Sequence, residues 1–580
     1  MLNKAWSHLS SYQKKYAIFI FILMFVAMFL ESLSVGIIIP LISILLKGNV
    51  DTGFLTNFIN FGKFEHENLI FFGLLITIVI FIFKSFVLTF NLWQQTNFLK
   101  KLQYEFTNRL FKHYLKADYI FFLKSNSALL YRNLTDLTST FVSYIKNYLT
   151  LLSELLVFLG LIGILFYVDF LSTTLIITLV ATLSLIIYYS TIRKISFFGK
   201  QRNKVNSELN KHLLQGMAAA KDVKILDREE DLIYNVDKHL SKMTSLNQVV
   251  QFITGLPRFA FELLIVFTFS TLVFVMISMG KEMQDIIQFL GVFAVASFRI
   301  IPGATRMLTS FQSIKYIQPS IKILLKEFEN NFDSLKKGKT NYKKQNINLD
   351  FKKEINLNNL SFSYPSRKEF SLTKVSAKIK KGDFVGIIGE TGSGKSTLVN
   401  LIIGLLTPSE GKVMVDDSNI SLNLSDWYKK IGYVPQSVYL TDDTIKKNIA
   451  FGLKDENIEN NLLNNALEKA SLSDFLKNLD EGIETIVGEK GIRLSGGQQQ
   501  RIGIARALYR DPEILILDEA TSSLDETTER KIMDSIQFLK RKKTLIVVTH
   551  RLSTVKNCDW IFFIDKGKIT KQGSPKEIIN

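Results

Sequence analysis

The sequence predicts a two-part chain: an α-helical membrane domain with six spanning helices, followed by an α/β domain built around a phosphate-binding loop. The 580 residues are 47% hydrophobic, yet they include 71 basic and 53 acidic residues, so apolar and soluble parts must be segregated. The long apolar segments all lie before residue 320. Beyond residue 355, apolar runs alternate with helix-like stretches, as in a parallel sheet. We therefore divide the chain into a membrane domain (1–320), a linker (321–354) and a soluble domain (355–580).

Six apolar segments are long enough to cross a bilayer, which takes about 20 residues in a helix. Several are longer than a bilayer needs, so their helices should project beyond the lipid. We expect the spans near 16–46, 68–95, 139–168, 171–192, 248–279 and 285–315.

Basic residues are concentrated in alternate connections between these segments. They precede the first span and fill the second-to-third and fourth-to-fifth connections, whereas 47–67, 169–170 and 280–284 contain only three lysines together. Lys and Arg collect on cytoplasmic loops, so we expect both termini to be cytoplasmic. The membrane arrangement also accounts for the net charge of +18 without nucleic acid as a partner.

The two basic connections are long and helix-like, and each contains a candidate short transverse helix. These helices are expected near 117–124 and 221–228, with plain solvated turns as the alternative. On the other side, residues 51–64 have the spacing of a short helix lying flat in the outer interface, and an ordinary loop is an equal alternative.

A phosphate-binding motif, G-x-x-x-x-G-K-[ST], follows the predicted strand 384–388 and precedes residues 398–406, which are expected to open a helix. Its glycines let backbone N–H groups surround an anion, while Lys395 can reach the β- and γ-phosphates and Ser396 can hold Mg²⁺. The sequence thus predicts a nucleoside triphosphate site. The residues expected to bind it are Gly389, Glu390, Thr391, Gly392, Ser393, Gly394, Lys395, Ser396 and Thr397.

An acidic pair, Asp518 and Glu519, follows the predicted strand 514–517. An aspartate at the end of a strand that faces a phosphate loop can organise Mg²⁺, and the adjacent glutamate can orient or deprotonate a water molecule. Alone, such a pair is more often a solvated strand end. Its position after a phosphate loop favours hydrolysis.

The run Leu494-Ser-Gly-Gly-Gln498 resembles the signature of ATP-binding cassette (ABC) proteins, and the other nucleotide-site motifs of that family follow in order. The resemblance implies that Tyr364 stacks on adenine, that Gln436 is the Q-loop glutamine and a metal ligand, and that His550 is the switch histidine. It also implies that Asp525 belongs to the D-loop, 523–525. Residues 485–491 resemble the stretch that contacts the membrane domain in ABC exporters.

The resemblance to ABC exporter half-transporters covers the whole chain and implies a homodimer. In that family the signature serine, here Ser495, lies at the N-terminus of a helix and contacts the γ-phosphate bound by the other subunit. Gly496, Gly497 and Gln498 complete the signature and are expected at the same site. It implies ATP and Mg²⁺ as cofactors, Glu519 and His550 as catalytic residues, and Ser396, Gln436 and Asp518 at the metal.

Ionisable residues within the spans are the candidates for substrate binding, because charges there are costly and usually face a cavity or a partner. The cations are Lys84, Arg258, Arg299 and Arg306, and the acids are Glu31, Glu154 and Glu262. The arginines could grip a phosphate or pyrophosphate. Two alternatives stay open: Arg258 and Glu262 stand four residues apart and could neutralise each other, and Arg306 could already lie beyond the bilayer.

The layout also resembles the PglK-type flippases of lipid-linked oligosaccharides, on residues 31–40 in the first span, the candidate helix 51–64 and the basic residues of the spans. This resemblance implies ATP-driven flipping of a polyprenyl-pyrophosphate-linked oligosaccharide across the bacterial inner membrane. Multidrug or glycolipid exporters share the architecture and remain the alternative. An ATP-gated channel is a further alternative, which steady ATP turnover coupled to transport would exclude.

Overall fold

The computed structural model describes residues 2–38, 41, 66–168, 170–341, 348–365, 369–520 and 526–579. Two compact units are present: the first is made of Met1–Ala117 and Phe121–Ser334, and the second includes Leu335–Asn580. The outer-interface helix predicted at 51–64 and the D-loop, including Asp525, lie outside the described residues.

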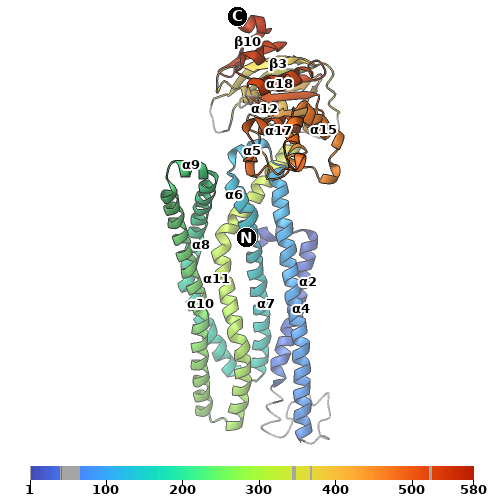
Figure 1. Cartoon of the computed structure of the whole chain (residues 1–580). Coiled ribbons are helices and arrows are strands. Elements are labelled where there is room, and N and C mark those ends of the chain that lie inside the picture. Colours follow the sequence, from blue (N-terminus) through green and yellow to red (C-terminus); the bar gives the residue numbers. More distant parts are fainter. Residues whose placement is uncertain are drawn as a thin grey trace. The chain divides into compact units, whose positions relative to one another are not determined.

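The first unit is a bundle of long helices, and the described residues include six that are long and apolar enough to cross a membrane (Figure 1). A helix of 50 residues such as α4 measures about 75 Å, against about 30 Å for the hydrocarbon core of a bilayer. The prediction of six apolar helices long enough to span a membrane is therefore confirmed, and helices as long as α4 exceed the thickness of a bilayer. The helices are α2 (Ser11–Gly36), α4 (His66–Leu115), α7 (Thr138–Val168), α8 (Phe170–Ala218), α10 (Glu229–Ser278) and α11 (Met283–Asn341).

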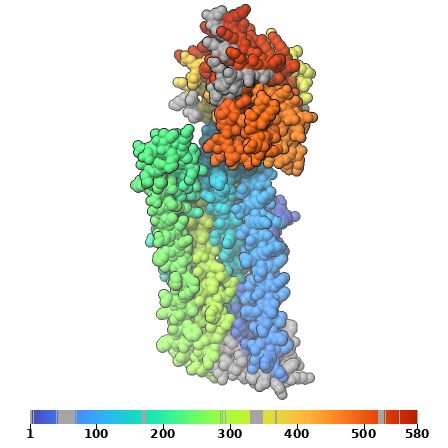
Figure 2. Space-filling view, viewed as in Figure 1, coloured from blue at the N-terminus to red at the C-terminus, as the bar shows by residue number. Residues whose placement is uncertain are grey.

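Within the bundle, α2 packs against α4 and α7, and α8 runs beside α10. A glycine allows the close approach of α7 to α2: a Cβ at Gly160 would lie 2.2 Å from Ser32 Oγ. Figure 2 shows the α8–α10 pair, in green, along one side of the bundle next to α11. The face of α4 carries exposed apolar side chains such as Phe72 and Ile82, which suits contact with lipid.

Short elements join the long helices. They are α1 (Leu2–Ser7), α5 (Tyr119–Lys124), α6 (Ser127–Arg132), a π-helical turn (Asn133–Leu137) and α9 (Ala220–Ile225). The two short helices predicted near 117–124 and 221–228 thus form, as α5 and α9. Helix α11 continues to Asn341, into the stretch predicted as the linker 321–354, and the first compact unit ends at Ser334. The linker boundaries stay a prediction. The Lys- and Asn-rich composition of this stretch concealed its helical continuation.

The second unit contains two sheets. The smaller is antiparallel, in the order β2 (Leu372–Lys380), β1 (Glu354–Phe362), β4 (Glu410–Val415), β5 (Ser418–Asn419). In the larger sheet five strands pair in parallel, and β10 joins as an antiparallel edge strand. Its order is β10 (Lys568–Gly573), β9 (Trp560–Asp565), β3 (Phe384–Ile388), β8 (Thr544–Val548), β7 (Ile514–Asp518), β6 (Ile431–Val434). The predicted α/β fold is confirmed.

The larger sheet is buried on both faces, as expected for parallel strands. Along β7, Leu515 and Leu517 join one apolar cluster, while Ile514 and Ile516 join the other. The helices of this unit are α12 (Lys395–Ile403), α13 (Leu424–Lys429), α14 (Ile445–Ile449), α15 (Asn460–Lys469), α16 (Ser473–Lys477), α17 (Gly496–Leu508), α18 (Glu526–Gln537), α19 (Leu552–Lys556) and α20 (Pro575–Ile579).

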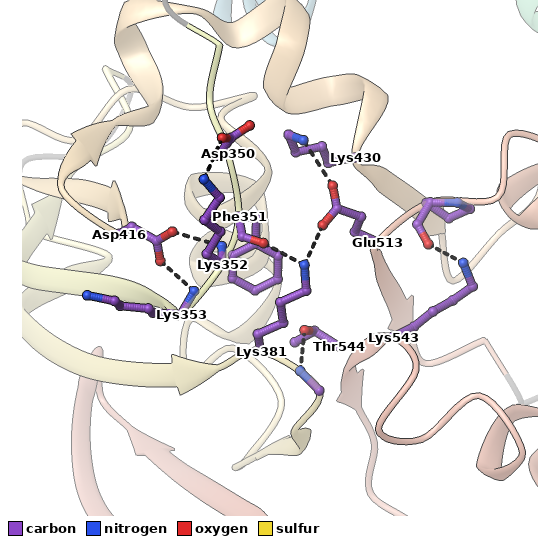
Figure 3. Close-up of polar contacts among 12 residues, drawn as sticks. Asp350, Phe351, Lys352, Lys353, Lys381, Asp416, Lys430, Glu513, Lys543 and Thr544 are labelled. Carbon is purple, nitrogen blue, oxygen red and sulfur yellow. Dashed lines mark hydrogen bonds and ion pairs between the residues drawn. The ribbon is translucent and has the colours of Figure 1, made fainter.

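A polar network fixes the start of this unit (Figure 3). The Asp416 carboxylate accepts hydrogen bonds from the backbone N–H groups of residues 352–354 at 2.8–2.9 Å. Burial acts to raise the pKa of Asp416, but these N–H donors hold it below its usual value. Lys381 Nζ donates to the Phe351 carbonyl at 2.6 Å and to Glu513 at 2.8 Å, and so ties the entering chain to the larger sheet.

Candidate active site

The strand order of the larger sheet brings the predicted nucleotide-site residues to one edge. The phosphate loop follows β3, His550 follows β8, Asp518 ends β7 and Gln436 follows β6. These four strands are consecutive neighbours, and they run parallel, so their carboxyl ends lie side by side. The carboxyl ends of parallel strands are where open α/β sheets bind ligands.

The phosphate loop has a backbone path that requires glycine at its two ends. Gly389 has φ 151°, and a Cβ there would lie 2.1 Å from the Ile564 carbonyl oxygen. Gly394 has φ 109°, and a Cβ there would lie 2.9 Å from the Ser371 carbonyl oxygen. Helix α12 runs from Lys395 to Ile403 and so begins three residues before the stretch expected to open it, because Gly394 already caps it; Gly404 follows the helix with a left-handed backbone.

Lys395 folds back onto the loop. Its side chain is buried, and Nζ donates hydrogen bonds to the carbonyl oxygens of Gly389 and Glu390, both at 2.9 Å. Burial lowers the pKa of Lys395, and the negative charges of Glu519 and Asp518 oppose that shift. A lysine held against the backbone of the phosphate loop in this way can neutralise the negative charge of a polyphosphate.

The hydroxyl of Ser393 shows that the loop fits such a ligand. This oxygen is buried within the phosphate loop and has no hydrogen-bond partner. Buried polar atoms are normally satisfied, so an orphan here points to an absent acceptor or donor. A phosphate oxygen at the loop would supply the partner.

Asp518 and Ser396 are brought together as the predicted metal ligands. Burial raises the pKa of Asp518, the charge of Glu519 adds to that rise, and hydrogen bonds from Tyr433 and Ser396 oppose it. Tyr433 Oη donates to Asp518 Oδ2 at 3.4 Å. One carboxylate and one hydroxyl beside a phosphate chain suit Mg²⁺, which keeps several waters and uses few protein ligands. Within the part of the chain that the structure describes, no cluster of three His, Cys, Asp or Glu offers another metal site.

The Glu519 side chain is held between two other predicted site residues, Gln436 and His550. Gln436 Nε2 donates to Glu519 Oε2 at 2.7 Å, and His550 Nε2 lies 3.2 Å from Glu519 Oε1. The backbone of Glu519 is left-handed, with φ 49°, a strained conformation that is common at functional sites. The carboxylate is thus aimed by partners from the two neighbouring strand ends. Gln436, predicted to contact the metal, contacts Glu519 in this structure.

Tyr364 stands over the phosphate loop from the smaller sheet. Its hydroxyl lies 3.2 Å from Thr397 Oγ1, and its ring meets Phe362 edge to face. An aromatic ring so placed can stack on a base.

The signature stretch forms a helix N-terminus, as the resemblance implies. Ser495 caps α17 and forms a capping box with Gln498, with hydrogen bonds of 3.3 and 2.8 Å. Gly496 and Gly497 open the helix, so its free N–H groups make this end attractive to an anion.

Two residues that sequence reasoning left without a role connect these parts. Gln500 Nε2 lies 3.5 Å from the Gln436 carbonyl oxygen and so links α17 to the glutamine that holds Glu519. Tyr433 contacts Asp518. The sequence did contain a signal for Tyr433: it lies in the same motif as Gln436, on a strand whose residues alternate between the two faces of the sheet.

In the membrane unit, three of the four candidate cations meet two acids. Lys84 Nζ lies 3.1 Å from Glu31, Arg299 lies 3.1 Å from Glu31 and 3.3 Å from Glu154, and Arg306 lies 2.6 Å from Glu154. Sequence reasoning named these acids but did not pair them. Arg258 stands apart: it is exposed on α10 and pairs with Glu262 at 3.0 Å, as the alternative interpretation expected.

Comparisons with known proteins agree for both units. Residues 17–300 match the family model "ABC transporter transmembrane region", and residues 372–522 match the model "ABC transporter". Over 228 residues the chain is 41% identical to an ATP-dependent lipid A-core flippase of Cupriavidus metallidurans, covering 39% of this chain and 38% of that protein. It is 41% identical over 226 residues to the ATP-dependent lipid A-core flippase of Pasteurella multocida, covering 39% of each. It is 43% identical over 232 residues to ABC transporter B family member 21 of Arabidopsis thaliana, covering 40% of this chain and 18% of that protein.

The matched part of the chain therefore spans less than half the length of these curated relatives. Among solved structures, that of a bacterial Atm1-family ABC exporter with ATP bound aligns with a TM-score of 0.74 over 98% of this chain and 97% of the other. The identity of 21% makes this a likeness of fold.

Proposed function

The chain belongs to the ABC transporter family, and from that premise we propose that it is an ATP-driven transporter that flips a polyprenyl-pyrophosphate-linked oligosaccharide across the bacterial inner membrane. The observation that carries the proposal is the arrangement of Glu519 between Gln436 and His550, beside a phosphate loop, in a chain with six spans among its described residues. Such a site has the residues needed to hydrolyse ATP, and the spanning helices allow the released free energy to drive transport.

The proposed chemistry is the attack of water on the γ-phosphorus of ATP. Glu519 orients the water and accepts its proton, while the bond from the γ-phosphorus to the bridging oxygen breaks and ADP leaves. Lys395 balances charge on the phosphates, and His550 and Gln436 fix the carboxylate of Glu519. Mg²⁺, when bound at Asp518 and Ser396, would neutralise developing charge on the phosphate oxygens.

The lipid-linked substrate is supported by the cations inside the spans. Arg299 and Arg306 lie on one face of α11 and contact the same carboxylate, Glu154. Guanidinium groups bind phosphate oxygens in pairs, so this face suits a pyrophosphate. Lys84 would add a further positive charge near these arginines. Arg258, already paired on its own helix, remains the weakest of the four candidates.

A second candidate, a lipid A-like glycolipid, is favoured by the names of the bacterial relatives, which are flippases of lipid A-core. Such a lipid also carries phosphate and sugar. For either substrate we propose a homodimer in the inner membrane with cytoplasmic termini, in which Ser495 of one chain faces ATP bound by the other.

The test is ATP hydrolysis by the purified protein in proteoliposomes, with a polyprenyl-pyrophosphate oligosaccharide, lipid A or a cationic drug added. Stimulation by the first, reduced by Arg299→Ala and Arg306→Ala, is expected. Stimulation by lipid A alone would select the second candidate. Stimulation by the drug alone, insensitive to both substitutions, would refute both.

A further inference from the structure

The ion pairs inside the membrane unit form one chain across four helices. Glu31 of α2 contacts Lys84 of α4 and Arg299 of α11, and Glu154 of α7 contacts Arg299 and Arg306 of α11. We call these five residues the membrane ion network.

The two carboxylates are the buried members of this network. The Glu31 and Glu154 side chains are 5% and 10% exposed, whereas exposure rises from 15% at Lys84 to 23% at Arg299 and 45% at Arg306. Arg306 is therefore where a ligand would first arrive, and Glu154 lies directly behind it. The chain leaves room for this carboxylate: a Cβ at Gly303 would lie 3.1 Å from Glu154 Oε2.

The charges of the network do not cancel. Among the described residues three cations meet two carboxylates, which leaves a surplus of one positive charge in the network of each chain. Two chains would hold a surplus of two, which equals the charge of a pyrophosphate diester. Uncompensated arginines in a bilayer would instead attract the phosphodiester lipids that surround them, because buried charges must be paired.

We propose that Glu154 is a specificity-determining residue, an internal counter-ion that keeps Arg299 and Arg306 from binding monoanionic membrane lipids while letting a doubly charged pyrophosphate lipid bind. The inference rests on the proposed function for the identity of the transported lipid. A monoanion replaces the carboxylate charge for charge and gains nothing, since it must also give up its hydration. A pyrophosphate brings a second charge and a second set of acceptors, so the exchange becomes favourable.

A purely structural role for Glu154 makes a different prediction. If the carboxylate only held α7 to α11, its loss would weaken the fold without changing which lipids bind. Preference between lipids is therefore the informative measurement, and thermal unfolding is the companion measurement.

Native mass spectrometry counts the phosphatidylglycerol molecules bound to the full-length protein. A second assay measures the phosphatidylglycerol concentration that halves the ATP hydrolysis stimulated by the pyrophosphate lipid. In Glu154→Gln, half-inhibition of the stimulated ATP hydrolysis should need a phosphatidylglycerol concentration about tenfold lower than in the wild type. That factor is of the order of one hydrogen bond to a charged group. Glu154→Asp should keep the wild-type preference. Adding Arg306→Gln to Glu154→Gln should return the lipid count toward wild type. Glu208→Gln, which frees Lys211 from an ion pair outside the predicted spans, is the matched control and should change neither value.

The outcomes separate this inference from the proposed function. Glu154→Gln could bind more phosphatidylglycerol while the pyrophosphate lipid fails to stimulate ATP hydrolysis. That result would support the counter-ion role of Glu154 and refute the pyrophosphate lipid as the substrate. Normal stimulation with unchanged phosphatidylglycerol binding in Glu154→Gln would overturn the counter-ion. If Glu154→Gln does not assemble, Glu31→Gln, which removes one of the two carboxylates that contact Arg299, should give a smaller rise in phosphatidylglycerol binding. Unchanged binding there would overturn the inference that these carboxylates exclude monoanionic lipids.

Discussion

At the scale of single residues, the site depends on how Glu519 is aimed. Its two carboxylate oxygens contact Gln436 and His550, which come from the ends of different strands. A glutamine at this position would keep the size and most hydrogen bonds, but it could not accept a proton from water.

We predict that Glu519→Gln binds ATP as the wild type does and loses turnover by about 10²-fold or more, the usual contribution of a general base. Nucleotide binding and phosphate release, measured on the same preparation, check this. Glu468→Gln, an exposed carboxylate on α15, is the control and should hydrolyse normally. Undiminished hydrolysis by Glu519→Gln would remove this residue from the mechanism.

Asp518 should make nucleotide binding sensitive to acid. Its pKa is raised by burial, so as the pH falls it takes up a proton earlier than an ordinary aspartate. In that window the folded protein binds a proton that the unfolded chain lacks, so folding becomes slightly more favourable while Mg²⁺ loses its ligand.

We therefore expect the affinity for Mg²⁺-ATP to fall at a pH above the usual range of aspartate. Titrations over a pH series would show this step in the wild type, whereas Asp518→Asn should bind weakly throughout and lack the step. A wild-type affinity that stays constant down to the ordinary aspartate range would contradict the assignment.

At the scale of elements, the phosphate loop was the most predictable part of the chain. Its motif fixes both the neighbouring strand and the helix, because glycine conformations and an anion-binding helix N-terminus leave few alternatives. Helix α12 begins three residues before the stretch expected to open it, since Gly394, inside the motif, already caps the helix. The continuation of α11 to Asn341 was not predicted, because a polar composition indicates loops only on average.

Two glycines of the loop allow a matched test of its backbone. Gly389→Ala places a Cβ 2.1 Å from a carbonyl oxygen, whereas a Cβ at Gly392 meets nothing within 4 Å although φ is 85°. Gly392→Ala should cost about 1–3 kcal/mol through backbone strain alone, and Gly389→Ala should cost more and abolish ATP binding. Thermal unfolding and ATP binding by the full-length variants are the measurements. Equal behaviour of the two would contradict this loop geometry.

At the scale of the whole molecule, the sequence predicted the six spans, the α/β fold and which residues meet at its edge. It did not predict the membrane ion network, because Arg306 and Glu154 are 152 residues apart and periodicity describes only neighbours along one helix. The pairing of Arg258 with Glu262 could be predicted because both lie on one helix.

The proposed dimer makes a prediction about mixed chains. A Lys395→Ala chain lacks the phosphate loop lysine, and a Ser495→Arg chain lacks the signature serine. Each alone should be inactive, but a mixed dimer contains one site with both parts intact. Coexpressed, tagged chains purified as the mixed species should regain measurable ATP hydrolysis. Activity in either variant alone, or none in the mixture, would contradict shared sites.

ATP-driven flipping is tested most directly by measuring ATP hydrolysis and lipid movement together in proteoliposomes that contain a labelled polyprenyl-pyrophosphate oligosaccharide. The wild type should release phosphate and move the label to the opposite leaflet only when ATP is present, and Glu519→Gln should do neither. Movement of the label at the same rate without ATP, or in Glu519→Gln, would contradict the account.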